Sequence, residues 1–298
     1  MTFLAIINPA AGAGRCGARA GAALDALRAR GLRIEEARTT HPGHATQLAR
    51  EAYARGVRKL IAVGGDGTGY EIVNGLLPEA LDAADKPLLG FLPLGTGNSF
   101  LRDFTDDGAV GSSAALAQGL RRPCDVVRME HTEGQRFFIN LLSAGFVADV
   151  ATTTNRRFKA LGAAGYVVSV VLEAASLEAK QWHLRPEGGR AWDPHAVFIS
   201  FNNSRYTGGR MLMAPYADTS DGKLDIVVAG PMSAGRLVTA FPRIFRGTHV
   251  HMPELSCTQT RDVQLQLDAP VDLMIDGEVE RYQPTRLTVL NHAIDVCA

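Results

Sequence analysis

The sequence predicts two domains: an N-terminal α/β domain built on a parallel sheet, and a C-terminal domain that is mainly an antiparallel β-sandwich. In the first third of the chain, short apolar runs alternate with helical segments, which is the pattern of consecutive βαβ units. After Arg121-Arg122-Pro123 the chain becomes strand-rich, which favours antiparallel pairing. With 298 residues the chain can form two modest cores, and we expect domains over residues 1–125 and 126–298.

The expected elements follow this change of rhythm. In the N-terminal domain, strands are expected at Phe3–Ile7, Arg33–Thr39, Lys59–Val63 and Leu88–Pro93, and helices near Arg15–Arg30, His44–Arg55, Tyr70–Leu77, Asn98–Phe104 and Ser112–Leu120. In the C-terminal domain, strands are expected at Asp125–Glu130, Arg136–Leu142, Ala196–Phe201, Leu224–Ala229, Val263–Leu267, Val271–Ile275 and Arg286–Leu290, with two helices near Ala163–Lys180 and Ser233–Phe245. Ligands of a parallel sheet bind beyond the carboxyl ends of its strands, so the loops after the first strands are candidate binding loops.

Composition excludes several classes of protein. Lys+Arg and Asp+Glu both number 31, so no bulk positive field is present to gather nucleic acid. The four cysteines form no CxxC pair, which favours reduced thiols in a cytoplasmic protein. The uncharged stretch Ala160–Leu172 is well short of the ~20 residues of a membrane-spanning helix, so no transmembrane segment is expected. Any contact with a membrane is therefore expected at its surface, and the sequence specifies no oligomeric state.

The strongest local signal is Gly64-Gly65-Asp66-Gly67-Thr68, which directly follows an apolar run. Glycines at a strand end let backbone N–H groups approach phosphate oxygens closely, and the start of the next helix adds a favourable dipole. A carboxylate there would repel a polyphosphate unless Mg²⁺ or a reacting hydroxyl lay between them, so Asp66 is a candidate for metal contact or proton acceptance. The structural alternative is a glycine turn in which Asp66 only caps the next helix.

Two further glycine-rich segments follow predicted strands. They are Pro93-Leu94-Gly95-Thr96-Gly97-Asn98 and Asn8-Pro9-Ala10-Ala11-Gly12-Ala13-Gly14. Three such loops at one edge of a sheet predict a nucleotide cradle. No loop has the sequence GxxxxGK[ST], and the first βα turn lacks GxGxxG followed by an acidic residue about twenty positions later. The P-loop and the dinucleotide-binding fold are therefore excluded as simple interpretations.

Taken together, the motifs resemble those of the diacylglycerol kinase and sphingosine kinase catalytic family, and most closely those of its soluble bacterial lipid kinases, along the full chain. The matching segments are NPAAG at Asn8, Thr40, GGDGT at Gly64, PLGTGN at Pro93, Asp125, Asn140–Phe146 and Ile275–Glu278. GGDGT alone is also similar to NAD kinases and phosphofructokinases. The resemblance therefore depends on the whole set.

The resemblance implies an ATP site and a magnesium network. The residues implied to contact ATP are Asn8, Thr40, Gly64, Gly65, Asp66, Gly67, Thr68, Gly95, Thr96 and Asn98. Asp66 and Asp125 are implied to belong to the network of water and Mg²⁺. The family commonly has Asp directly after the Asn of the second loop, where this chain has Ser99, so that acidic contribution is missing or moved. Asp103 could replace it, or could be an ordinary solvated helix residue.

The segment Asp276-Gly277-Glu278 is implied to supply the general base, so the candidate catalytic residues are Asp66, Asp276 and Glu278. Asp-Gly is also the commonest sequence of a tight hairpin turn, which is the purely structural interpretation. A base must reach the hydroxyl that it deprotonates, which favours the pair in the second domain over Asp66. The sequence does not separate Asp276 from Glu278.

The segment Ala217–Asp225 is rich in oxygen donors and contains a tight glycine turn, which suits a hard cation. The resemblance implies a structural Mg²⁺ here, held by the carboxylate of Asp221 and the backbone carbonyls of Asp218 and Lys223. A plain β-turn is the alternative.

The predicted function is ATP- and Mg²⁺-dependent transfer of the γ-phosphate to a hydroxyl of a membrane lipid such as diacylglycerol. Phosphoryl transfer requires mainly positioning and charge neutralisation, which a glycine-rich cradle, a bound cation and one base can supply. The protein is expected in the cytoplasm and transiently at the inner membrane surface, with the acyl chains in an apolar pocket of the C-terminal domain. Two alternatives stay open: a soluble-metabolite kinase of NAD kinase type, and a non-catalytic protein that binds lipid or nucleotide.

Overall fold

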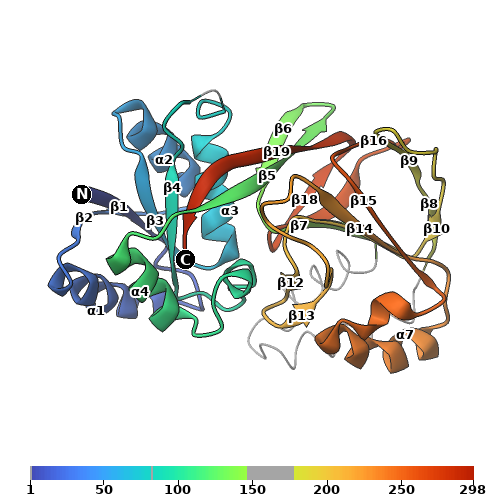
Figure 1. The fold of residues 1–298 in the computed structure, drawn as a ribbon, viewed down its shortest axis with the longest axis horizontal. Coiled ribbons are helices and arrows are strands. Elements are labelled where there is room, and N and C mark those ends of the chain that lie inside the picture. The colour runs from blue at the N-terminus through green and yellow to red at the C-terminus, as the bar shows by residue number, and fades with distance from the viewer. Residues whose placement is uncertain (1, 82, 146–177) are drawn as a thin grey trace. The chain divides into compact units, whose positions relative to one another are not determined.

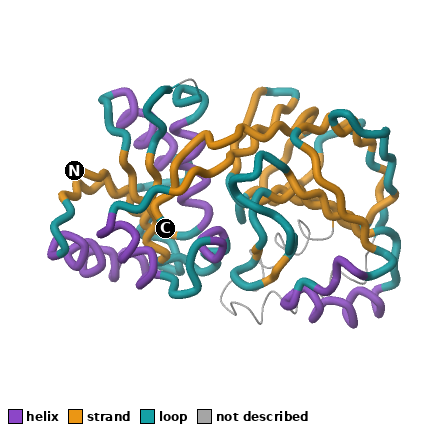
Figure 2. The backbone as a smooth tube through the Cα atoms, in the orientation of Figure 1, coloured by secondary structure: helices purple, strands orange, loops and turns teal. Residues whose placement is uncertain are grey.

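The computed structural model describes residues 2–81, 83–145 and 178–298 (Figures 1 and 2). It divides into two compact units, one made of Met1–Val126 with Leu290–Ala298 and the other of Val127–Val289. The predicted fold class is confirmed, because the first unit contains a parallel sheet with helices and the second contains antiparallel strands. The sequence predicts one C-terminal domain over residues 126–298, whereas in the structure Leu290–Ala298 belong to the first unit.

The first unit is built on parallel strands in the order β2-β1-β3-β4-β19. These strands are β1 (Thr2–Ile7), β2 (Arg33–Arg38), β3 (Lys59–Gly64), β4 (Leu88–Pro93) and the last residues of β19 (Pro284–Cys297). Ile7 lies opposite Val63, and Val63 lies opposite Leu92. The carboxyl ends of β1 to β4 therefore share one edge of the sheet, as the sequence predicted.

Helices cover both faces of this sheet (Figure 1). Helix α1 (Arg15–Ala29) and helix α4 (Ala109–Gln118) bury Cys16, Leu24 and Leu116 against one face. Helix α2 (His44–Ala54) packs on α3 (Asp66–Leu76), and Gly69 of α3 lies so close to Phe91 that a Cβ would be 2.9 Å from its ring. Since successive strand residues face opposite sides, Phe91 belongs to the other face from Leu92.

Two helical predictions in this unit need correction. Helix α3 begins at Asp66 and not near Tyr70, so the glycine motif itself forms the first helical turn. The predicted helix at Asn98–Phe104 is a single 3₁₀ turn, η1 (Phe100–Asp103). Asn98 has a φ of 46°, in the left-handed region, which prevents a helix from starting there.

The second unit contains a six-stranded antiparallel sheet in the order β15-β14-β11-β7-β17-β18. Its strands are β7 (Leu141–Gly145), β11 (Phe198–Asn202), β14 (Leu224–Ala229), β15 (Leu255–Thr260), β17 (Val271–Ile275) and β18 (Glu278–Tyr282). Strand β5 (Arg122–His131) begins in the first unit and ends in this one. The other strands of the unit are β6 (Gly134–Phe138), β8 (Lys180–Gln181), β9 (His183–Pro186), β10 (His195–Ala196), β12 (Tyr206–Thr207), β13 (Met211–Leu212) and β16 (Asp262–Gln266), and β19 begins here. Strand β16 pairs with both β9 and the first part of β19.

Several predictions for this unit also need correction. The strand expected at Arg136–Leu142 is two strands, β6 and β7, interrupted at Ile139 and Asn140. The strand expected at Arg286–Leu290 is part of the much longer β19. The helix expected at Ser233–Phe245 is α7 (Ala234–Ala240) followed by η5 (Phe241–Arg246). The helix expected at 163–180 falls mostly on 146–177, outside the described residues, and Lys180 lies in β8.

The core of the second unit is an apolar cluster on one face of the six-stranded sheet. It includes Leu141, Phe198, Ala229 and Met274 from four neighbouring strands, and Ile244 from η5 packs with them. Among the described helices, none is both long and apolar enough to span a membrane.

Candidate functional site

Two loops that follow strands β1 and β4 are tied to the end of β3. The backbone N–H of Asn8 donates to the carbonyl of Val63 at 3.0 Å, and the N–H of Gly95 donates to the carbonyl of Gly64 at 2.7 Å. The side-chain amide of Asn8 also lies 3.4 Å from the hydroxyl of Thr68, in the first turns of α3. The structure therefore brings all three predicted glycine-rich segments together at one edge of the sheet.

The contacts between these loops are contacts between backbones. A Cβ on Gly95 would lie 2.4 Å from the Cα of Gly65, a separation at which the two atoms would overlap. A Cβ on Gly12 would lie 2.8 Å from the carbonyl oxygen of Leu94, and Gly12 has a φ of +62°. Glycine is needed at these positions because only a backbone without a side chain can approach another so closely.

Asp66 bridges the first and second glycine-rich loops. Its carboxylate accepts hydrogen bonds from the backbone N–H of Ser99 at 2.8 Å and of Phe100 at 3.4 Å. The hydroxyl of Ser99 donates to it as well. Burial raises the pKa of the Asp66 carboxyl, and the bonds from Ser99 and Phe100 oppose that rise. The site thus holds a carboxylate in surroundings that penalise its charge, which a cation would offset.

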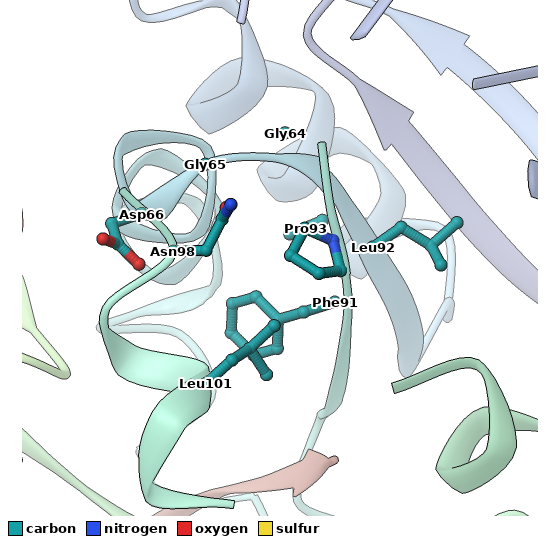
Figure 3. Close-up of a pocket in the computed structure, with 9 residues that line it drawn as sticks. Gly64, Gly65, Asp66, Phe91, Leu92, Pro93, Asn98 and Leu101 are labelled. Carbon is teal, nitrogen blue, oxygen red and sulfur yellow. The ribbon is translucent and has the colours of Figure 1, made fainter. Parts of the chain in front are cut away.

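A small cavity lies at these strand ends, between the two loops (Figure 3). Its lining residues are Ala62, Gly64, Gly65, Asp66, Phe91, Leu92, Pro93, Asn98 and Leu101. In Figure 3 the carboxylate of Asp66 and the amide of Asn98 come from the two different loops. The Asn98 amide donates to the carbonyl of Gly95 at 3.1 Å, which closes the second loop on itself.

The remaining residues of the predicted ATP set lie at the same edge. Gly67 belongs to the first turn of α3, and Thr96 is exposed at the tip of the second loop. Thr40 follows β2, and its backbone N–H donates to Nδ1 of His44 at 3.1 Å.

Glu71 of α3 positions the loop after Thr40, a role that sequence reasoning missed. Its two carboxylate oxygens accept from the backbone N–H groups of Gly43 at 3.0 Å and Ala45 at 2.9 Å. These groups belong to the start of α2, where a negative side chain is favourable. The residues lie 28 and 26 positions apart in the chain, so no local pattern signals the contact.

Asp125 is fully buried in β5 of the first unit. One of its carboxylate oxygens accepts the backbone N–H of His292 at 2.7 Å. His292 has a φ of 50°, in the left-handed region, within β19. The contact observed for Asp125 therefore fixes an unusual backbone position on the strand that returns to the first unit.

Asp276 and Gly277 form the two-residue turn between β17 and β18. Ile275 pairs with Glu278 across the turn, and both turn residues have positive φ, 47° and 93°. This is the signature of a type I′ hairpin turn.

The carboxylate of Asp276 is buried and binds backbone. It accepts from the N–H groups of Ile139 at 2.9 Å, Asn140 at 2.9 Å and Leu141 at 3.0 Å. These bonds explain why the chain breaks between β6 and β7, since the N–H groups of the break are satisfied by a side chain. Asn140 is in turn held by Ser204, whose hydroxyl bonds its side chain, and by the backbone N–H of Asn203.

Glu278 is exposed, in contrast to Asp276. It opens β18, and the next residue, Val279, packs against the apolar cluster of the second unit. Glu278 thus places an exposed carboxylate beside the turn, at the start of a strand that packs against the apolar core.

The loop that contains Asp218, Asp221 and Lys223 precedes β14. The carboxylate of Asp218 accepts from the backbone and hydroxyl of Ser220, and that of Asp221 accepts from the backbone N–H of Lys223 at 2.9 Å. Burial raises the pKa of nearby Asp225 to about 6, and the charge of Asp221 adds to the rise. The carboxylates of Asp221 and Asp225 therefore repel each other here. Among the described residues, no cluster of three acidic, His or Cys side chains surrounds a common metal position.

An apolar cavity lies within the second unit, over the ends of β11, β14 and β15 and beneath α7 and η5. Among the described residues, four methionines and two phenylalanines make up half of its wall, other apolar side chains supply most of the rest, and His249 is polar. Such a cavity suits hydrocarbon rather than a polar metabolite.

Two family models match the chain. Residues 2–129 match the diacylglycerol kinase catalytic domain, and residues 140–298 match the YegS C-terminal NAD kinase beta sandwich-like domain.

Individual relatives agree with these models. The chain is 29% identical over 295 residues to a diacylglycerol kinase of Mycobacterium tuberculosis, covering 98% of this chain and 93% of that protein. It is 31% identical over 264 residues to a "Probable lipid kinase YegS-like" of Serratia proteamaculans, and the match covers 86% of this chain and 82% of that protein. A crystal structure from Bacillus anthracis str. Sterne superimposes with a TM-score of 0.80 at 21% identity, covering 99% of this chain and 94% of that one. The similarity to this solved structure, at 21% identity, supports the fold alone.

The backbone contact between the loops makes a direct prediction. Gly95→Ala should lower the free energy of unfolding by ~1–3 kcal/mol, because its Cβ overlaps the Gly65 backbone and forces the loops apart. Urea denaturation measures this. Gly21→Ala is the matched control, since a Cβ in that helical position meets nothing within 4 Å and should stabilise by ~0.5–1 kcal/mol. Equal stabilities for the Gly95 variant and the parent would contradict the loop contact.

Proposed function

Because this chain belongs to the family of diacylglycerol kinases and YegS-like lipid kinases, we propose that it transfers the γ-phosphate of ATP to a hydroxyl group of a membrane lipid such as diacylglycerol. The chain is thus a lipid kinase, and the alternatives of an NAD kinase and of a non-catalytic binding protein are set aside. The observation that supports the proposed reaction best is the backbone cradle of the three loops around Asp66.

The cradle suits the phosphates of ATP. Its glycines leave space for phosphate oxygens at the backbone, and the N-terminus of α3 at Asp66 adds the positive end of a helix dipole. The side chains of Asn8, Thr40, Thr96 and Asn98 surround it with amide and hydroxyl groups. These groups bind phosphate and ribose without supplying a net positive charge, which agrees with the absence of a lysine in the motifs.

The donor set also fits magnesium. Burial penalises the charged form of the Asp66 carboxylate, and the three bonds from Ser99 and Phe100 leave it with acceptor capacity to spare. When bound, Mg²⁺ would neutralise charge on the transferring phosphoryl group. Ser99 leaves the site with one carboxylate fewer than the family commonly has, and its hydroxyl stabilises the charge of Asp66 instead.

We assign the role of general base to Glu278 and a positioning role to Asp276. The Asp276 carboxylate is occupied by three backbone N–H groups, and hydrogen bonds of that kind make a carboxylate a weaker base. Glu278 is exposed beside the same turn and can approach a lipid hydroxyl. Asp276 then holds the turn, and with it Glu278, against residues 139–141.

The acyl chains of the lipid are proposed to occupy the apolar cavity of the second unit. Residues of segment α7–η5 line one side of this cavity. On the same segment Val238 and Phe245 are 39% and 50% exposed. Arg243 and Arg246 are exposed on the same segment. Apolar and basic side chains together favour transient contact with an anionic membrane surface, from which the lipid can enter.

A second magnesium ion is proposed at the loop before β14. The donor set fits, since a hard cation prefers carboxylate and carbonyl oxygens and would relieve the crowding of Asp221 with Asp225. The carboxylate of Asp221 and the backbone carbonyls of Asp218 and Lys223 would hold it.

The proposed reaction predicts that radiolabel moves from γ-labelled ATP to diacylglycerol in anionic vesicles, and that none moves to NAD. Thin-layer separation of the products measures the transfer, with omission of Mg²⁺ as the control. Co-sedimentation with the same vesicles reports membrane contact. Labelled NAD without labelled lipid would refute the proposal.

The assignment of the base predicts that Glu278→Gln lowers kcat by ~10²–10⁴ while MgATP affinity and thermal stability stay near parental values. Asp276→Asn should lower stability by ~1–3 kcal/mol along with activity, because its amide nitrogen cannot accept the buried N–H bonds. Glu133→Gln, an exposed glutamate at another hairpin of the same unit, is the matched control. Parental turnover by the Glu278 variant, with a stable but inactive Asp276 variant, would reverse the assignment.

The proposed cation predicts that Asp221→Ala lowers the stabilisation of the protein by Mg²⁺ in the absence of ATP. In the parent, Mg²⁺ at about 100 times its Kd should add ~2.7 kcal/mol of stability, because it binds only the folded loop. Thermal melts with Mg²⁺ and with EDTA measure the increment. Asp272→Ala, an exposed aspartate of β17, should keep it. An equal increment in the parent and the Asp221 variant would leave the loop as a simple turn.

A further inference from the structure

The loops of the proposed nucleotide cradle contain no basic side chain. Asn8–Gly14, Gly64–Thr68 and Pro93–Asn98 have neither Lys nor Arg, and Asp66 adds a negative charge to them. The triphosphate of ATP is itself strongly anionic, so these loops leave negative charge in excess even with a magnesium ion bound. A basic side chain at the edge of the cradle would reduce this excess.

Arg15 directly follows the first loop and begins helix α1. Its Nε donates a hydrogen bond to the backbone carbonyl of Gly12 at 2.8 Å, so the side chain folds back over its own loop. A Cβ placed on Gly12 would lie 3.7 Å from that Nε and 3.7 Å from the Cα of Gly95. The guanidinium of Arg15 therefore lies where the first loop meets the second.

The charge of Arg15 is exposed, and no neighbouring acid neutralises it. Other arginines of the chain form ion pairs, as Arg28 does with Asp25 at 2.9 Å. Across the described part of the chain, no carboxylate forms an ion pair with Arg15. The bond to Gly12 uses only Nε, so the terminal nitrogens of the guanidinium have N–H groups to offer a ligand.

The position of Arg15 within its helix is also unfavourable for a cation. The first turn of a helix carries partial positive charge, which favours acidic side chains and disfavours basic ones. Helix α1 has no acidic residue in its first turn. Sequences break local rules of this kind mainly at functional sites. A bound anion would offset both the charge of Arg15 and the helix dipole.

We propose that Arg15 binds the phosphate groups of ATP, with the terminal nitrogens of its guanidinium donating to phosphate oxygens while Nε stays bonded to Gly12. The proposal rests on the proposed function, in that the three loops hold a nucleotide. A planar guanidinium recognises phosphate through paired, charge-assisted hydrogen bonds. Because Gly12 already holds the side chain, less conformational entropy is lost when the phosphates arrive.

The test measures displacement of a fluorescent ATP analogue from the whole chain in the presence of Mg²⁺. The competitors are ATP, inorganic tripolyphosphate and adenosine. Arg15→Gln keeps a long polar side chain and removes the charge, so it should weaken the binding of ATP and tripolyphosphate by about 10- to 100-fold and leave that of adenosine unchanged. Raising the ionic strength should weaken ATP binding by the parent more than by this variant.

Two further variants separate charge from position. Arg19→Gln, also exposed and one turn further along α1, is the matched control and should bind every competitor as the parent does. Arg15→Lys keeps the positive charge without the planar fork, so it should lose less affinity than Arg15→Gln. Thermal melts without nucleotide show that each variant is folded.

Parental affinity of Arg15→Gln for ATP and tripolyphosphate would overturn the proposal, and so would an equal loss of affinity for adenosine. Failure of the proposed function is seen separately. Loss of phosphate binding in Arg15→Gln, with no lipid labelled by the parent, would refute the kinase reaction and support the role of Arg15. Labelled lipid, with parental ATP binding by the variant, would do the reverse.

Discussion

The contact of Gly65 with Gly95 is the constraint on which the proposed nucleotide site depends. The ends of β3 and β4 lie side by side, and the loops that follow them touch through their backbones. Without side chains between them, the loops place Asp66 directly beside the N–H groups of Ser99 and Phe100. The same closeness determines where α3 and η1 begin. The position of the carboxylate, the start of two helical segments and the space for phosphate therefore all follow from one contact.

Three aspartates of this chain show how surroundings separate residues that look alike in sequence. Asp66, Asp125 and Asp276 all accept backbone N–H bonds, and the partners lie far away along the chain. The partner of Asp125, His292, has a left-handed φ, and Asp276 has one itself, so both sets of bonds hold an unusual backbone position in place. Asp66 lies in a small cavity at the strand ends, where a ligand can reach it. Accessibility, more than residue type, distinguishes the chemical role from the structural one.

Much of the fold was predictable because its signals are local. The apolar runs at β1, β3 and β4, and the glycine motifs after them, can be identified within a few residues. Two of the failures involve partners that are distant in the chain. The break between β6 and β7 depends on Asp276, more than a hundred residues later, and the return of β19 to the first unit depends on pairing with β4.

In the proposed reaction the two units contribute different kinds of selectivity. A cradle made of backbone and neutral side chains recognises phosphates in a way that many kinases can share, as the wide occurrence of GGDGT indicates. In the proposed reaction the choice of acceptor therefore comes from the second unit, where a cavity lined in part by methionines and phenylalanines can adapt to many chain shapes. Shape alone separates hydrocarbon chains poorly, since one methylene changes binding by only ~1–3 kcal/mol.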